Sequence, residues 1–106
     1  MNDNQRILLN LKSHLNQNFD KPIKDVILFG SRASGDANET SDYDILIILD
    51  SDYSWSDENR ILDLCYDIDL KYNIIIDVHL MSKNEIGSLR GKQPIFVNAI
   101  KTGAYA

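Results

Sequence analysis

The sequence predicts an α+β fold, close to α/β proteins in its alternation, with a small mixed β-sheet backed by helices. Segments rich in β-branched residues alternate with segments of helical periodicity. A chain of 106 residues can form one domain with one modest core. It contains no internal repeat, low-complexity tract or linker. We therefore expect residues 1–106 to form a single domain.

The first helix and the first strand follow from local signals. Asn2 or Asp3 can cap a helix that runs to about Asn16. Its apolar residues recur at helical spacing: Ile7, Leu8, Leu11 and Leu15. The first strand then extends from Lys24 to Phe29.

The middle of the chain contains the next strand and the next helix. The polar residues 35–40 predict a loop, and the apolar residues 43–49 predict the second strand. Ser54 offers a capping signal for a helix that runs to about Tyr72. Its expected buried face consists of Ile61, Leu64, Cys65 and Ile68.

The last third of the chain predicts one more strand and two more helices. The third strand is expected at residues 73–80, which are rich in β-branched residues. Residues 82–85 form a capping box for a short helix that breaks near Gly91. Pro94 suits the first turn of a last helix that Gly103 closes.

Composition narrows the class of protein. The formal net charge of -5 argues against tight sequence-independent binding of nucleic acid, which requires Lys and Arg to neutralise phosphates. The single Cys65 excludes an internal disulfide and fits a reducing compartment. The N-terminus has no signal-peptide pattern, and no apolar run approaches the length of a membrane span. We expect a cytoplasmic protein that contacts neither a membrane nor nucleic acid directly.

A motif of two carboxylates marks the start of the second strand. Gly30-Ser31 is followed after ten residues by Asp42-Tyr43-Asp44. Alternation along a strand predicts that Asp42 and Asp44 share one face, with Tyr43 turned away. The carboxylate oxygens of two such residues are suitable ligands for Mg²⁺, which completes its coordination shell with water and substrate phosphate. The Gly-Ser turn can present N–H groups and a hydroxyl to an anion, particularly if Arg32 opens a short helix.

A third carboxylate lies in the next strand. Asp77 interrupts the apolar run of residues 73–80, where an Asp is costly unless it is paired or bound to metal. If the two strands are neighbours, the three carboxylates could hold two cations for an in-line displacement at phosphorus. We expect them along one edge of the open face of the sheet. His79 shares the strand face of Asp77, but a single His without partner spacing is not assigned to the site.

Each of these features has a structural alternative. Gly30-Ser31 could be an ordinary turn, and Asp42 could merely flank a strand. Asp44 could be a surface residue on an edge strand, and Asp77 could be a solvent-facing strand position. Like charges on one face repel, which weakens a purely structural explanation of the pair.

The order Gly30-Ser31, Asp42-x-Asp44 and Asp77 resembles the DNA polymerase β-like nucleotidyltransferase superfamily. The short chain and the C-terminal residues 94–103 resemble its minimal branch, the MNT antitoxins of HEPN toxins. The resemblance covers about residue 20 to the C-terminus and implies the polymerase β-like nucleotidyltransferase core.

The resemblance also implies roles for the motif residues. Asp42, Asp44 and Asp77 would bind the metal, two Mg²⁺ ions in all, and Asp77 would help to deprotonate the acceptor. Ser31 would contact the triphosphate, Gly30 would allow its close approach, and Arg32 could add positive charge.

The reaction so implied is transfer of AMP from ATP to a hydroxyl, often a tyrosine, of a HEPN-type toxin, so that the chain acts as an antitoxin. The alternative is an antitoxin that acts by binding alone, with little or no catalysis. Adenylylation of a small molecule is the weakest of the three, because one small domain leaves no room for a second substrate-binding domain.

Overall fold

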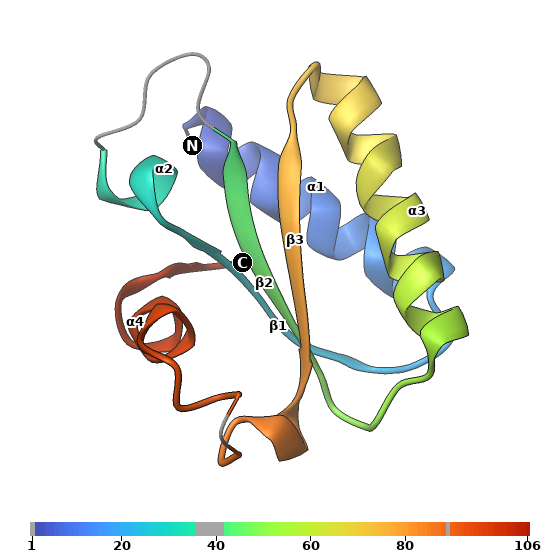
Figure 1. Cartoon of the computed structure of the whole chain (residues 1–106). Coiled ribbons are helices and arrows are strands. Elements are labelled where there is room, and N and C mark those ends of the chain that lie inside the picture. The colour runs from blue at the N-terminus through green and yellow to red at the C-terminus, as the bar shows by residue number, and fades with distance from the viewer. Residues whose placement is uncertain (1, 36–41, 89) are drawn as a thin grey trace.

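The computed structural model describes residues 2–35, 42–88 and 90–106 (Figure 1). Residues 36–40 of the predicted polar loop lie outside the described residues. The elements, in chain order, are α1 (Asp3–Asn18), β1 (Ile23–Phe29), α2 (Ser31–Ser34), β2 (Tyr43–Leu49), α3 (Trp55–Tyr72), β3 (Ile76–Ser82), the 3₁₀ turn η1 (Lys83–Glu85), α4 (Pro94–Thr102) and β4 (Ala104–Tyr105).

The described strands form one mixed sheet in the order β3-β2-β1-β4. β1 and β2 pair antiparallel, whereas β2 and β3 pair parallel because α3 carries the chain back between them. β4 adds to the other edge of β1, antiparallel to it. The predicted α+β architecture with a small mixed sheet is therefore confirmed.

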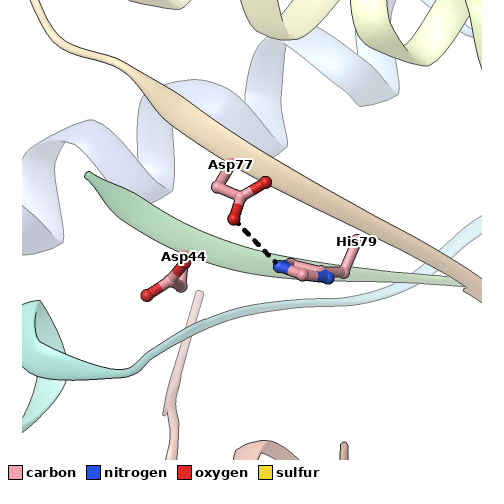
Figure 2. A group of neighbouring side chains, drawn as sticks. All are labelled: Asp44, Asp77 and His79. Carbon is pink, nitrogen blue, oxygen red and sulfur yellow. Dashed lines mark ion pairs between the residues drawn. The ribbon is translucent and has the colours of Figure 1, made fainter. Parts of the chain in front are cut away.

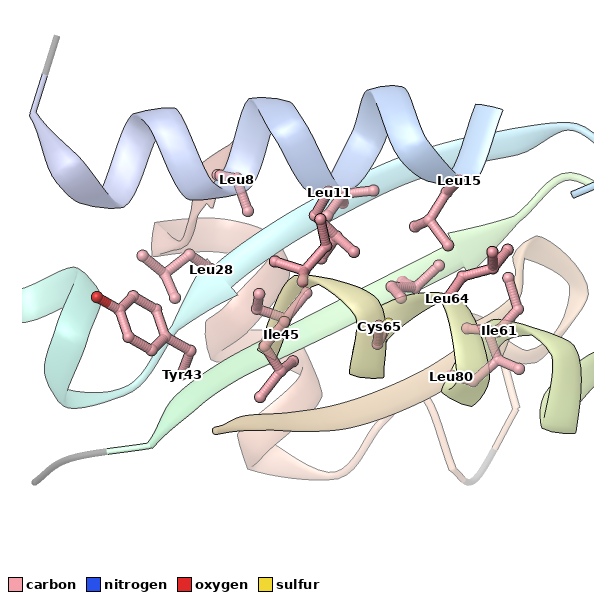
Figure 3. Packing of buried hydrophobic residues seen from close by; sticks show 14 of the residues in the cluster. Leu8, Leu11, Leu15, Leu28, Tyr43, Ile45, Ile61, Leu64, Cys65 and Leu80 are labelled. Atoms are coloured by element: carbon pink, nitrogen blue, oxygen red, sulfur yellow. The ribbon is translucent and has the colours of Figure 1, made fainter. Parts of the chain in front are cut away.

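Helices cover both faces of this sheet. Figure 1 shows α1 and α3 on one side and α4 on the other. The larger core cluster joins α1 and α3 to alternate strand residues, as Figure 3 shows for Leu11, Ile45 and Leu64. A smaller cluster under α4 contains the strand residues of opposite parity, with Phe96 and Ala99 from the helix. The second face is thus partly covered by α4, and is less open than the sequence suggested.

The helix limits follow from the capping residues in the sequence. Asn2 caps α1 through a capping box with Gln5, and Ser54 caps α3 through a capping box with Asp57. β2 and α3 occupy the predicted residues, and α1 is two residues longer than predicted. Pro94 and Gly103 flank the last helix as predicted.

Three elements differ from their predictions. β3 begins at Ile76 instead of Asn73, because Asn73 ends α3 with φ of 53° and Ile74 N–H donates to the Asp69 carbonyl. The helix predicted after Ser82 is only the 3₁₀ turn of η1, although its capping box forms. The last residues form β4, which the sequence did not predict.

Among the described residues, no helix has both the length and the apolar character needed to cross a membrane.

Candidate functional site

The central feature of the candidate site is a pair of carboxylates on two parallel strands. Asp44 of β2 and Asp77 of β3 are direct neighbours in the strand register, near the start of both strands. Strand alternation turns both away from the α1 and α3 core, toward the face that carries α4. Figure 2 shows Asp44 and Asp77 on adjacent strands. Two of the three predicted metal ligands are therefore brought together.

His79 joins this pair, although the sequence analysis did not assign it to the site. One ligand atom from each of Asp44, Asp77 and His79 lies within 4.8 Å of the others. The distance between His79 Nε2 and Asp77 Oδ2 is 3.5 Å (Figure 2). The signal for this contact was in the sequence: residues two apart in a strand point to the same side.

Two aromatic residues hold the His79 ring. Its centroid lies 5.3 Å from that of Phe29 and 6.0 Å from that of Phe96, the latter in an edge-on arrangement. Phe29 comes from the end of β1 and Phe96 from α4. The imidazole thus lies between the two carboxylates and the apolar cluster on the same face of the sheet.

The electrostatics of the pair favour a cation. The pKa of Asp44 is raised, first by burial and then by the nearby charge of Asp77, while the charge of His79 acts in the opposite direction. A carboxylate that is partly buried beside a second negative charge, as Asp44 is, gains stability when a positive ion lies next to it.

Gly30, the residue that follows β1, lies beside the Asp44 carboxylate. Phe29 pairs with Asp44 in the sheet, so the residue that follows β1 lies beside the Asp44 side chain. Gly30 has φ of 74° and ψ of -154°, a conformation open essentially only to glycine. A Cβ at this position would lie 2.4 Å from Asp44 Oδ2. The backbone conformation therefore requires glycine here, and a side chain at this position would also displace the Asp44 carboxylate.

The remaining predicted residues are placed as follows. Ser31 begins α2 and is half-buried, next to the Gly30 turn. Asp42 is exposed, precedes β2, and is not one of the three clustered groups, although its charge adds slightly to the rise in the pKa of Asp44. Two residues along a strand correspond to about 6.6 Å, which separates Asp42 from Asp44. Tyr43 is turned away into the core, as predicted.

Arg32 lies apart from the carboxylates. Its guanidinium carbon is 4.4 Å from the centroid of the Tyr43 ring, on the α1 side of the sheet. It lines a second cavity of about 520 Å³ between α1, α2 and the C-terminal residues. The structure therefore does not bring the Arg32 side chain to Asp44 and Asp77.

A cavity of about 510 Å³ opens in front of the carboxylates, a size typical of small-ligand sites. One wall consists of Asp44, Asp77 and His79. Gly30 and α2 form the second wall. α4 contributes the third, with the side chains of Ile95, Asn98 and Thr102. The cavity thus combines acidic groups, a backbone turn and a partly apolar helix face.

The comparisons with known proteins concern most of the chain. The model of a family described as "Nucleotidyltransferase domain" matches residues 8–101. Two curated Methanocaldococcus jannaschii proteins are similar over shorter stretches. "Putative protein adenylyltransferase MJ0604" is 44% identical over 61 residues, which are 58% of this chain and 56% of that protein. "Putative protein adenylyltransferase MJ0141" is 38% identical over 58 residues, 55% of this chain and 59% of that protein. The matched stretches span little more than half the length of these relatives.

Two solved structures share the fold. One is a mutant of the toxin-antitoxin MntA-HpeT, with a TM-score of 0.60 and 18% identity, covering 99% of this chain and 72% of that chain. The other is a toxin-antitoxin with AMP-PNP, with a TM-score of 0.59 and 20% identity, covering 96% of this chain and 71% of that chain. The likeness extends over nearly the whole of the present chain.

Proposed function

Because the chain belongs to the nucleotidyltransferase domain family, we propose that it transfers AMP from ATP to a tyrosine hydroxyl of a HEPN-type toxin and thereby acts as its antitoxin. The observation that carries this proposal is the Asp44 and Asp77 pair facing the Gly30 turn across one cavity. The relatives named as protein adenylyltransferases and the fold shared with toxin-antitoxin structures support it.

The donor set fits a divalent cation. Asp44 and Asp77 offer carboxylate oxygens, the ligands that Mg²⁺ prefers. His79 Nε2 lies buried beside them and has no hydrogen-bond partner in the part of the chain that the structure describes. We assign the metal to Asp44 and Asp77, with Asp42 as a further ligand for the second ion. When bound, the ions would neutralise phosphate charge and polarise the reacting phosphoryl group.

The residues of the chain would position and activate the two substrates. The Gly30-Ser31 turn would contact the triphosphate. Gly30 has no side chain, so the space next to Asp44 stays open for a phosphate group. Arg32 stays a proposed phosphate contact that requires its guanidinium to leave the Tyr43 ring. The cavity of about 510 Å³ would hold the nucleotide.

Asp77 is the proposed base. Its side chain is 56% exposed, so a hydroxyl from a partner protein can approach it. The acceptor oxygen would form its bond to the α-phosphorus as the bond from that phosphorus to the bridging oxygen breaks. The hydroxyl proton would go to Asp77, and pyrophosphate would leave.

The second candidate is an antitoxin that acts by binding alone. It is favoured by an exposed apolar row on α3, away from the carboxylates: the side chains of Leu62, Tyr66 and Leu70 recur every four residues and are 42%, 58% and 65% exposed. Such a row could contact a partner without any chemistry.

Intact-mass measurement of the partner distinguishes the two candidates. The protein is co-expressed with the partner encoded beside it, as wild type or as Asp77→Asn. Wild type is expected to add one or more adenylyl groups to the partner, and Asp77→Asn to add about a thousandfold less. Asp63→Asn, an equal change of charge on the exposed side of α3, is the matched control and should retain full transfer.

Two outcomes would contradict the proposal. If Asp77→Asn labels the partner as strongly as Asp63→Asn does, Asp77 takes no part in the reaction. An unlabelled partner that wild type and Asp77→Asn neutralise equally, at equal protein levels, would favour binding alone.

A further inference from the structure

We propose that His79 is a metal ligand, so that one cation of the site is held by two carboxylates and one imidazole nitrogen and is preferentially a first-row transition-metal ion such as Mn²⁺. This inference rests on the proposed function, because it concerns the same cation site.

The strand geometry places the three groups around one point. Asp44 and Asp77 are register neighbours on parallel strands, and His79 follows Asp77 by two residues on the same face. Their ligand atoms lie within 4.8 Å of one another. In an octahedral site with bonds of about 2.1 Å, opposite ligands are about 4.2 Å apart. Small side-chain adjustments therefore suffice to bring all three onto one ion.

The ring nitrogen that faces this point has no hydrogen bond among the described residues. His79 Nε2 is buried, although the side chain as a whole is 23% exposed. Its distance of 3.5 Å from Asp77 Oδ2 exceeds the usual hydrogen-bond range of about 2.7–3.2 Å. A buried polar atom without a partner is costly, and a metal ion between Nε2 and the carboxylates would satisfy it.

The ring is also held in place. Phe29 and Phe96 pack near it at centroid distances of 5.3 and 6.0 Å, from two different elements. A His whose purpose was only to fill this apolar site would be replaced equally well by Leu or Phe. The orientation of Nε2 toward Asp77 and Asp44 instead suits a ligand held ready before the ion arrives.

The identity of the donors determines the metal preference. Mg²⁺ prefers oxygen ligands and binds nitrogen poorly, whereas imidazole is a good ligand for first-row transition metals. Replacing one of three oxygen donors with imidazole therefore lowers the advantage of Mg²⁺ at this position. The second proposed ion, held by oxygen donors and the triphosphate, keeps the Mg²⁺ preference.

The test is pulsed EPR of Mn²⁺ bound to the purified protein in the presence of AMP-PNP. Direct coordination by His79 predicts a ¹⁴N coupling of imidazole in the wild type. His79→Gln should lose that coupling and bind Mn²⁺ about tenfold or more weakly, with little change for Mg²⁺. The chain offers a matched control, His14→Gln, because it has only two histidines and His14 pairs with Asp67 on α1 and α3. This variant should keep the coupling.

Each other outcome counts against the inference. Bound Mn²⁺ without a ¹⁴N coupling in the wild type would overturn it and leave the proposed nucleotidyl transfer intact. No bound Mn²⁺ at all would overturn both the inference and the proposed cation site. Histidine labelled with ¹⁵N replaces an imidazole ¹⁴N coupling with a ¹⁵N coupling, whereas the nitrogens of AMP-PNP keep ¹⁴N. The labelled wild-type protein therefore decides between these results, and the test does not depend on whether His79→Gln folds.

Discussion

The two faces of β2 differ in what their side chains do. On the face toward α1 and α3, all four side chains are apolar and almost fully buried: Tyr43, Ile45, Ile47 and Leu49. On the face toward α4, Leu46 and Ile48 are buried in the same way, but Asp44 opens into the cavity. The first face is a continuous core, whereas the second combines a small core with a site. β2 thus contributes to the core along its whole length on one face, and on the other face it carries the candidate site near its N-terminal end.

This difference shows how one small sheet can carry both a continuous core and a candidate site. The helices α1 and α3 bury one face of the sheet along the length of the strands, and this face supplies most of the core. The other face is covered by α4 only in part, so a cavity opens at one end of it. Gly30, Asp44 and Asp77 all lie at that end, where β1 finishes and the parallel pair of β2 and β3 begins. Placing the carboxylates of Asp44 and Asp77 side by side costs stability, and the apolar core on the opposite face of the sheet offsets that cost.

The largest effect on stability is expected in the core behind the site. Ile47→Ala, at a position that is 0% exposed in the larger cluster, should lower the free energy of unfolding by about 2–5 kcal/mol, through lost burial and a cavity. Ile48→Ala should lie at the low end of that range, because Ile48 belongs to the smaller cluster on the opposite face, which contains fewer buried residues. Urea unfolding of the two variants measures the difference. An equal or larger loss in Ile48→Ala would mean that the two faces do not differ as described.

A smaller effect is expected at the turn that faces the carboxylates. Gly30→Ala should cost about 1–3 kcal/mol through its backbone conformation and should also displace the Asp44 side chain. Gly35→Ala is the matched control, since it also has positive φ but its Cβ would meet nothing within 4 Å. Both variants should be destabilised in urea, but only Gly30→Ala should weaken Mn²⁺ binding. Equal Mn²⁺ affinity in the two variants would show that Gly30 does not affect the cation site.

The smallest effects concern the pH dependence of two carboxylates with opposite shifts. Lys21 and the Ser54 cap lower the pKa of Asp57, so this group adds stability that is present above the unperturbed pKa of about 3.9 and is lost as pH falls through its folded pKa. Burial and Asp77 raise the pKa of Asp44, so its charged form costs stability at neutral pH. That cost shrinks as pH falls below the raised pKa and is gone below the unperturbed pKa.

The two Asn variants should therefore differ in sign. At neutral pH and without added metal, Asp57→Asn should be less stable than wild type and Asp44→Asn should be more stable. Both differences should shrink as pH falls, that of Asp44→Asn at the higher pH. Urea midpoints measured across the acid range give the two curves. If Asp44→Asn were destabilised as much as Asp57→Asn, Asp44 would be a structural carboxylate.

The parts of the fold that depend on local signals were predictable from the sequence. Caps and helical periodicity placed α1 and α3, and the apolar run placed β2. β4 was not predictable, because a two-residue strand exists only through its pairing with Ile27 and Leu28 of β1. The start of β3 was predicted too early because Asp69 determines it: its carbonyl accepts from Ile74 N–H and its carboxylate from Ile76 N–H.

For the site, the sequence was sufficient where strand alternation applied. The inward turn of Tyr43 follows from it, whereas the pairing of Asp44 with Asp77 also required β2 and β3 to be neighbours in this register. The same rule pointed to His79, but the position of its ring between Phe29 and Phe96 depends on packing from three elements. The placement of Arg32 on the Tyr43 ring likewise depends on the direction in which α2 leaves the sheet, which no local pattern determines.

The intact-mass measurement of the partner, combined with urea unfolding of the same variants, tests the central claim most directly. That claim is that Asp44 and Asp77 serve chemistry, and that the burial of Asp44 beside the charge of Asp77 costs stability. Asp44→Asn and Asp77→Asn are predicted to lose transfer of AMP by about a thousandfold while they unfold at the same or higher urea concentration than wild type and Asp63→Asn. Variants that transfer AMP at the wild-type level, or that lose transfer only because they unfold earlier, would contradict it.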